Sequence, residues 1–171
     1  MAFGQQVEAS WGVLSPHERV LACLAVIADG TTAEPGDIRG LDGDVIQEIA
    51  DDQPAPLADA YRCFLEAAGY GAGRFLQGSD VFHPEIIGLR DAARDLLEDD
   101  DILTEDDRVI LMHQGCQFDF LRGHGPDPEV WSYCEGNAPE RRYACFTDWL
   151  KANAEEQTKA WAQLAPWCGE T

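Results

Sequence analysis

The chain has 171 residues, of which 45% are hydrophobic and 26% are charged. This is the composition of a globular protein and excludes a wholly disordered chain. Its 32 acidic residues against 12 lysines and arginines give a formal net charge of −20. Such a charge repels phosphate backbones and anionic membranes, so we expect neither a nucleic-acid nor a membrane partner. It favours encounter with a basic protein, although acidic residues also serve solubility alone.

The six cysteines are scattered and form no C-x-x-C pair, so neither a disulfide scaffold nor a zinc site is indicated. We expect reduced thiols, no metal and no cofactor. The apolar run Val20–Ala28 is too short to cross a bilayer, and no basic leader region precedes it. These features predict a cytoplasmic protein.

The first predicted helix has a clear start. Ser15 is placed to cap it, Pro16 occupies the first helical position, and Glu18 completes a capping box. Gly30 is the expected end of this helix. Residues 30–40 are rich in glycine and threonine and predict a loop.

Three further helices are predicted before residue 100. Asp42 is placed to cap the second, and apolar residues spaced i, i+4, i+7 and i+8 from Leu57 predict the third, which ends at Gly69. Short strands are expected at Arg74–Leu76 and Ser79–Phe82, followed by a fourth helix over Leu89–Leu97.

The segment Arg108–Phe146 changes period and predicts an antiparallel meander. Val109–Met112 is a continuous apolar run, as in a strand covered on both faces, whereas the later strands alternate. The fold class is therefore α+β, with N-terminal helices, a central mainly antiparallel sheet and a C-terminal helix. The remaining expected features are a two-residue turn at Gln114-Gly115, strands at Cys116–Leu121, Glu129–Cys134 and Arg142–Phe146, a loop at Gly123–Pro128, and Thr147 as the cap of the last helix.

Counting residues across the two later hairpins places Cys116 opposite Cys134, and Cys134 opposite Cys145. These three thiols would then form one cross-strand row. Small core residues are the simplest interpretation of this row, and a thiolate metal site or an oxidisable pair is the alternative.

No catalytic constellation emerges from the motifs. With 32 acidic residues, carboxylate pairs arise by chance and carry no information. His113, beside the predicted turn, is the most suggestive histidine, and we expect it to be a hydrogen-bonded structural residue. The chain is therefore predicted not to be an enzyme.

Three blocks of sequence carry a family resemblance. They are Pro56–Gly69 (PLADAYRCFLEAAG), Gly73–Leu89 (GRFLQGSDVFHPEIIGL) and Val109–Glu135. The last block holds a hydrophobic strand, an H-Q-G turn, F-x-F, a D-P pair and an aromatic-x-Tyr step. In this order the blocks resemble the SUKH superfamily, in its Smi/Knr-type branch. The similarity spans roughly residues 36–150, and Cys116 departs from it, because the family often has an aromatic residue there.

The resemblance implies a non-enzymatic α+β binding domain over residues 36–171, with residues 1–35 as an N-terminal helical extension. Many bacterial members look like immunity proteins, which bind and block a cognate toxin, often a nuclease. Fungal relatives are regulatory scaffolds, so a regulatory module that binds a cellular protein is the alternative function. Fold alone does not decide between them.

The candidate partner-binding residues lie in the acidic run and along the last strands of the meander. A nuclease holds its substrate on a basic surface, which an acidic protein can occupy. Aromatic residues often supply much of the binding energy at such interfaces, so Trp131 and Tyr133 are included. Burial in the core is the alternative for both. The candidates are Glu98, Asp99, Asp100, Asp101, Glu105, Asp106, Asp107, Asp127, Glu129, Trp131, Tyr133 and Glu135.

Overall fold

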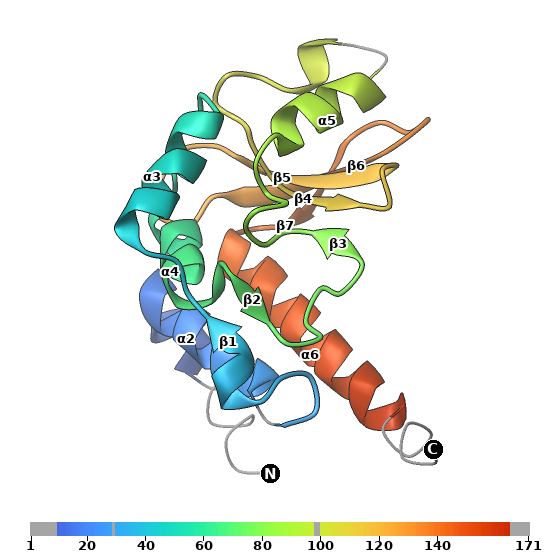
Figure 1. The fold of residues 1–171 in the computed structure, drawn as a ribbon. Coiled ribbons are helices and arrows are strands. Elements are labelled where there is room, and N and C mark those ends of the chain that lie inside the picture. Colours follow the sequence, from blue (N-terminus) through green and yellow to red (C-terminus); the bar gives the residue numbers. More distant parts are fainter. Residues whose placement is uncertain (1–9, 29, 98–99, 165–171) are drawn as a thin grey trace.

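A computed structural model describes residues 10–28, 30–97 and 100–164 (Figure 1). Within these ranges it has five α-helices and two antiparallel sheets, which confirms the predicted α+β class. The helices are α2 (Pro16–Ile27), α3 (Gly43–Asp52), α4 (Asp59–Ala68), α5 (Leu89–Leu96) and α6 (Phe146–Leu164). Short 3-10 turns are η1 (Trp11–Val13), η2 (Pro35–Asp37) and η3 (Asp100–Ile102).

The larger sheet is a meander of five strands in sequence order. It consists of β3 (Ser79–Asp80), β4 (Arg108–His113), β5 (Gln117–Arg122), β6 (Glu129–Cys134) and β7 (Glu140–Tyr143). A two-stranded sheet pairs β1 (Ile38–Arg39) with β2 (Gly71–Ala72). The meander follows the prediction, whereas β1 lies in a segment that we expected to be a loop throughout.

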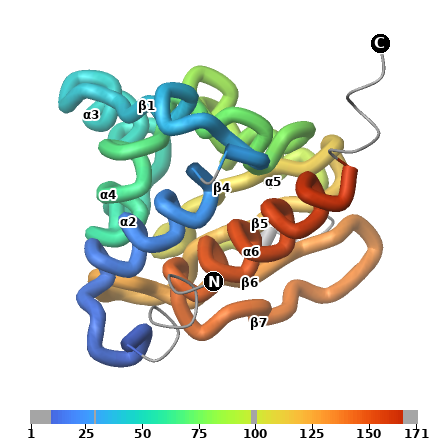
Figure 2. The backbone as a smooth tube through the Cα atoms, turned by 90° about the horizontal axis from the view of Figure 1, so that it is seen from below, coloured from blue at the N-terminus to red at the C-terminus, as the bar shows by residue number. Residues whose placement is uncertain are grey.

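The five-stranded sheet lies between α5 on one face and α6 on the other (Figure 1). Figure 2 shows α2 and α6 side by side beneath the sheet. Because side chains alternate along a strand, the two faces receive different residues. Phe118, Phe120 and Tyr133 point towards α5, and the Tyr133 hydroxyl lies 3.5 Å from the Leu96 carbonyl oxygen. Asp119 points towards α6 and accepts a hydrogen bond from the Trp149 indole at 2.9 Å.

The N-terminal helix signals act as predicted. Ser15 accepts a hydrogen bond from the Glu18 backbone N–H, and the Glu18 carboxylate accepts one from the Ser15 N–H, which completes the capping box. Asp42 caps α3 by accepting from the Val45 N–H at 3.1 Å. Val20 and Ile27 of α2 are fully buried in the common hydrophobic core, so this helix packs as part of the same body.

Two strand predictions are wrong in their positions. Arg74–Leu76 forms turns rather than a strand, and Leu76 has a positive φ of 54° while its N–H donates to the Gln157 side chain. The last strand covers Glu140–Tyr143 instead of Arg142–Phe146, because α6 already begins at Phe146. Thr147 is therefore not the helix cap but a buried residue in the first turn of α6.

The predicted cysteine row does not form, because both later hairpins have a different register from the one expected. His113 pairs with Gln117, so the turn holds Gln114, Gly115 and Cys116. Cys134 then lies opposite Gln117 rather than Cys116. Cys145 lies beyond the end of β7, beside Thr147 in the first turn of α6. In the β6–β7 hairpin Ser132 pairs with Glu140, so Cys145 is not opposite Cys134 either, and the alignment of the three thiols is lost.

Gly40 marks the closest approach between the first loop and α4. A Cβ atom at this position would lie 1.7 Å from the Glu66 carbonyl oxygen, which is backbone and cannot move aside. Leu41 N–H donates to the Leu65 carbonyl at 3.1 Å in the same region. The absence of a side chain at Gly40 is therefore what lets β1 lie against α4.

We expect Gly40→Ala to lower the free energy of unfolding by at least about 3 kcal/mol, because the added methyl must displace backbone. Gly36→Ala is the matched control, since nothing lies within 4 Å of a Cβ there. The control should stay within about 0.5 kcal/mol of the wild type. Urea unfolding monitored by tryptophan fluorescence measures both. Equal midpoints for the two variants would contradict this account of the β1–α4 contact.

Candidate functional site

The meander brings several of the predicted acidic residues to one end of the sheet. β4 and β6 begin at this end and β5 finishes there, so the acidic segment before β4 meets the β5–β6 loop. The Arg122 guanidinium at the end of β5 holds η3 in place by donating to the Ile102 carbonyl at 2.7 Å. We call this region the acidic end, and it comprises Asp59, Asp101, Glu105, Asp106 and Glu129.

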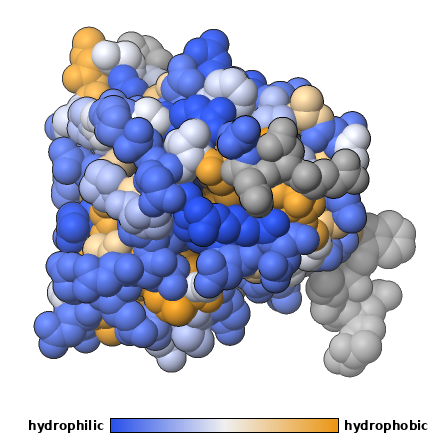
Figure 3. Space-filling model, turned by 90° about the horizontal axis from the view of Figure 1, so that it is seen from above, coloured by the Kyte–Doolittle hydropathy of each residue, from blue (hydrophilic) through white to orange (hydrophobic). Residues whose placement is uncertain are grey.

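Three members of the acidic end fall within one six-residue stretch of the sequence and are exposed. Asp101, Glu105 and Asp106 all have exposed side chains. Glu105 lies 3.5 Å from Arg94 of α5, and Asp106, 65% exposed, lies 3.8 Å from the His124 ring. Glu98 and Asp99 lie outside the described residues, as does the side chain of Asp100. Seen from the α5 side, the surface is mostly hydrophilic, and hydrophilic side chains separate its apolar patches (Figure 3).

Asp107 is not an exposed contact residue, contrary to the prediction for the acidic run. Its side chain is 0% exposed and forms a two-pronged ion pair with Arg122, at 2.9 and 2.7 Å. The Asp107 carboxylate also accepts a hydrogen bond from the Thr104 N–H, and the Asp107 backbone carbonyl accepts one from the Arg90 guanidinium. Hydrogen bonding to Asp107 raises the pKa of Arg122. Asp107 therefore shapes the loop before β4 from inside.

Asp127 is likewise a structural residue. Its carboxylate accepts the Thr147 N–H at 3.0 Å and the Thr147 hydroxyl at 2.6 Å, and Arg19 lies 3.9 Å away. Only 9% of its side chain is exposed. It therefore supplies one N–H group in the first turn of α6 with an acceptor and connects the β5–β6 loop to α2 and α6.

Glu129 and Trp131 form a half-buried surface cluster on β6. The Arg141 guanidinium, 2.8 Å away, and the Trp131 indole hydrogen-bond to Glu129 and lower the pKa of its carboxyl group. Arg122 lies over the Trp131 ring, 4.9 Å from its centroid. This part of the candidate site thus carries cations as well as acids.

The other two candidates are not at the acidic end. Tyr133 is buried against Phe118, with ring centroids 5.1 Å apart, and so belongs to the core. Glu135 follows β6 at the opposite end of the sheet, about 20 Å from Glu129 along the strand. Its N–H donates to the Cys116 carbonyl at 2.9 Å. The structure therefore separates Glu135 from the other acids.

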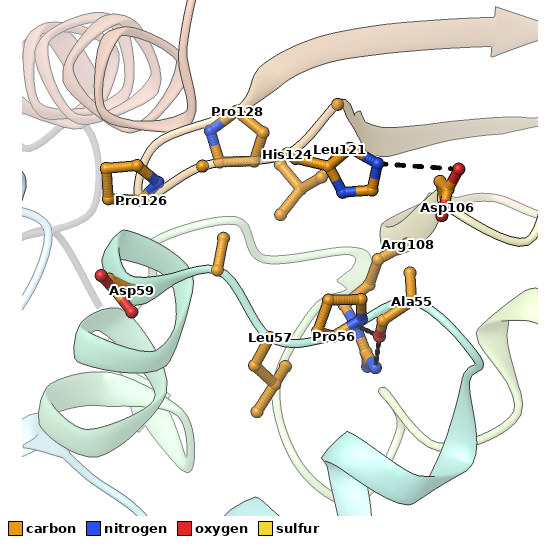
Figure 4. A pocket seen from close by; sticks show the side chains of 13 residues that line it. Ala55, Pro56, Leu57, Asp59, Asp106, Arg108, Leu121, His124, Pro126 and Pro128 are labelled. Carbon is orange, nitrogen blue, oxygen red and sulfur yellow. Dashed lines mark hydrogen bonds and ion pairs between the residues drawn. The ribbon is translucent and has the colours of Figure 1, made fainter.

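A cleft of about 330 Å³ opens beside the acidic end, between the α3–α4 linker and the β5–β6 loop (Figure 4). The loop was predicted from the sequence but the cleft was not, because the two walls of the cleft are far apart in the chain. Asp106 lies at one end of the cleft and Asp59 at the other. We call it the proline cleft, since its walls include Pro56, Pro126 and Pro128.

A second hollow of about 330 Å³ lies on the α6 side of the sheet. Arg142 and Glu140 in its lining pair with each other at 2.6 Å, so the hollow has no strong charge of either sign. Asp119 lies behind it and hydrogen-bonds to Ser132 and Trp149. Burial raises the pKa of Asp119. Its hydrogen bonds join α6 to the sheet, which is a structural role.

The strongest arrangement for nucleophilic chemistry is a serine–histidine pair. Ser79 Oγ lies 2.8 Å from His113 Nδ1, between β3 and the end of β4. Within the described ranges no carboxylate hydrogen-bonds to this ring, and neither residue lines the two hollows described above. A triad needs such an orienting group, so the pair is an interstrand hydrogen bond.

The described residues contain neither a metal-binding cluster nor a membrane-spanning helix. Across residues 10–28, 30–97 and 100–164, no group of three or more histidine, cysteine or acidic side chains is arranged to hold a metal ion. None of the helices in those ranges is long and apolar enough to cross a bilayer.

Searches of protein families, curated proteins and solved structures found no match to this chain. Membership of the SUKH superfamily therefore stays a prediction.

We expect Asp107→Asn to lower the free energy of unfolding by about 3 kcal/mol, because it leaves Arg122 without its ionic partner. This expected loss is at the lower end of the range for breaking a buried ion pair, because the Arg122 side chain is 29% exposed. Asp106→Asn removes the same charge from the neighbouring exposed position and should change stability by less than about 0.5 kcal/mol. Urea midpoints of the two variants measure the difference. Similar losses would show that Asp107 does not organise the loop.

Asp119 should give the protein a pH dependence of opposite sign to that of a salt-bridged acid. Because its pKa is raised in the folded state, the free energy of unfolding falls as the pH rises from about 4 through the raised pKa. Asp119→Asn cannot ionise and keeps an oxygen for the Trp149 indole. We expect its stability relative to the wild type to increase between about pH 4 and about pH 7.

Urea midpoints at both pH values measure this relative stability, with exposed Asp80→Asn as the charge-matched control. The control should show little change between the two pH values. If Asp119→Asn were equally destabilised at both, ionisation of Asp119 would have no cost in the fold.

Proposed function

We propose that the protein is an acidic, non-enzymatic binding domain that occupies the basic surface of another protein. Its partner on this proposal is a toxin domain, which it neutralises by covering the substrate-binding surface. The observation that supports this most directly is the acidic end, where Asp101, Glu105 and Asp106 are exposed in one segment and Asp106 lines a cleft. Carboxylates placed in this way attract and orient a basic partner.

A nuclease toxin is the partner class that this surface suits best. A nuclease must hold phosphates on lysines and arginines, so its own active surface is basic. Covering that surface with carboxylates blocks the substrate without any chemistry by the binder. The overall charge of −20 acts in the same direction at long range. The resemblance to immunity proteins of the SUKH superfamily agrees with this proposal but is a separate expectation.

The direct test is protection from toxicity. The toxin candidate is the protein encoded next to this chain, expressed with and without it in a sensitive cell. Restored growth supports the immunity function. Tight binding of a cellular protein without any protection would favour the regulatory-scaffold alternative, and turnover of a small substrate that depends on Ser79 and His113 would overturn both.

Charge removal at the acidic end should slow association with the partner. We expect Asp101→Asn/Glu105→Gln to lower the association rate constant by about threefold to tenfold at low salt. Asp44→Asn/Glu48→Gln, on the exposed side of α3, removes the same charge outside the acidic end and serves as control. Stopped-flow association at low and high salt measures both. An association rate that is independent of salt would contradict electrostatic attraction.

A further inference from the structure

The walls of the proline cleft are held in place by hydrogen bonds. The Ala60 N–H at the start of α4 donates to the Pro126 carbonyl at 2.8 Å, which connects the two walls. The Arg108 guanidinium holds the other end of the linker by donating to the Ala55 carbonyl. Gly123 and Gly125 have φ of 98° and 129°, conformations that favour glycine and let the loop turn back over the linker. The cleft is therefore formed before any ligand arrives.

The chemistry of the cleft is apolar along its walls and acidic at its ends. Pro126 and Pro128 face Pro56 and Leu57 across the opening, with Asp59 and Asp106 at either end (Figure 4). Asp59 is exposed and has no ion-pair partner in the part of the chain that the structure describes. Among the described residues, the ion-pair partner of Asp106 is the exposed His124 ring, 3.8 Å away. Both carboxylates can therefore accept a cation.

The buried cation beneath the cleft does not cancel this acidity. The donors of Arg108 point away from the opening, towards the carbonyls of Ile49, Ala50 and Gln53 at the end of α3. A helix C-terminus carries a partial negative charge, which offsets the charge of this guanidinium. An anionic ligand would therefore meet Asp59 and Asp106 and would not be bound by the Arg108 guanidinium, whose donors are already used.

The size and chemistry of the cleft match one long, cationic side chain. A volume of about 330 Å³ is at the lower limit for ligand sites, which is small for a cofactor. An aliphatic stem fits between proline and leucine side chains, with a charged head at a carboxylate. A guanidinium is the better head, because it is planar, pairs with carboxylates through two donors and stacks on flat rings such as that of His124.

We propose that the proline cleft binds an arginine side chain of the partner protein, with its guanidinium at Asp106 or Asp59. This rests on the proposed function, which supplies a basic partner, and adds the residue type that the partner inserts. His124 would leave Asp106 when the guanidinium arrives. Specificity would then come from this cleft, and attraction at longer range from Asp101 and Glu105.

The test uses the full chain and a small probe, so it needs no identified partner. N-acetyl-arginine amide is titrated into ¹⁵N-labelled protein, and N-acetyl-citrulline amide, which has the same shape without the charge, is the matched control. We expect saturable shifts at the backbone N–H groups of Leu57, Asp59, His124 and Gly125 with the arginine probe. Equal responses to both probes, or arginine shifts spread evenly over all acidic surfaces, would overturn the proposal.

Two variants test whether the carboxylates at the ends of the cleft bind the arginine probe. Asp106→Asn and Asp59→Asn should each weaken binding of the arginine probe by about threefold to fivefold, the loss expected for one partly exposed charge pair. Asp80→Asn changes the net charge equally on β3, which does not line the cleft, and should leave binding unchanged. Unchanged urea midpoints confirm that all three variants fold. Equal weakening by Asp80→Asn would show that only the net charge matters.

The two proposals fail separately. If the toxin is neutralised but the cleft shows no response to arginine, the arginine site is wrong and the immunity function stands. If the cleft binds arginine but no toxin is neutralised, the proposed function is wrong while the site remains.

Discussion

The buried guanidinium of Arg108 is the interaction on which the arrangement of α3, α4 and the sheet depends. It lies at the start of β4, is 1% exposed, and donates to the carbonyls of Ile49, Ala50, Gln53 and Ala55. These carbonyls end α3 and begin the linker, and none has a helical partner, so each would otherwise be an unsatisfied acceptor. One side chain thus ends a helix, directs the linker and fixes the floor of the proline cleft.

Gln53 continues the same connection. Its side-chain amide donates to the Val109 carbonyl and accepts the Val109 N–H, at 2.9 and 2.8 Å, as a neighbouring strand would. The linker between α3 and α4 is therefore bound to β4 by two consecutive residues of that strand. Burial lowers the pKa of Arg108, and the carbonyls around it stabilise its charged form. The candidate site is built on this rigid corner, which is what a preformed cleft requires.

Local signals in the sequence were sufficient for most of the fold. The capping box at Ser15, the Asp42 cap and the strand over Glu129–Cys134 each depend on neighbours within a few residues, and each prediction agrees with the structure. What could not be predicted depends on distant partners. Asp107 cannot be distinguished in the sequence from the other acids of its run, because its partner Arg122 lies 15 residues further along the chain. Asp127 cannot be distinguished from an ordinary loop residue, because its partner Thr147 lies 20 residues further along.

The sheet ends on each side in a strand that offers little to another chain. β3 has only two residues, and β7 is four residues long with Glu140, Arg141 and Arg142 in succession. Short and charged outer strands discourage the addition of a further strand from a second molecule. A partner would therefore have to recognise this protein through side chains and loops, not through backbone pairing. In that case specificity can change by substitution of a few surface residues while the scaffold stays the same.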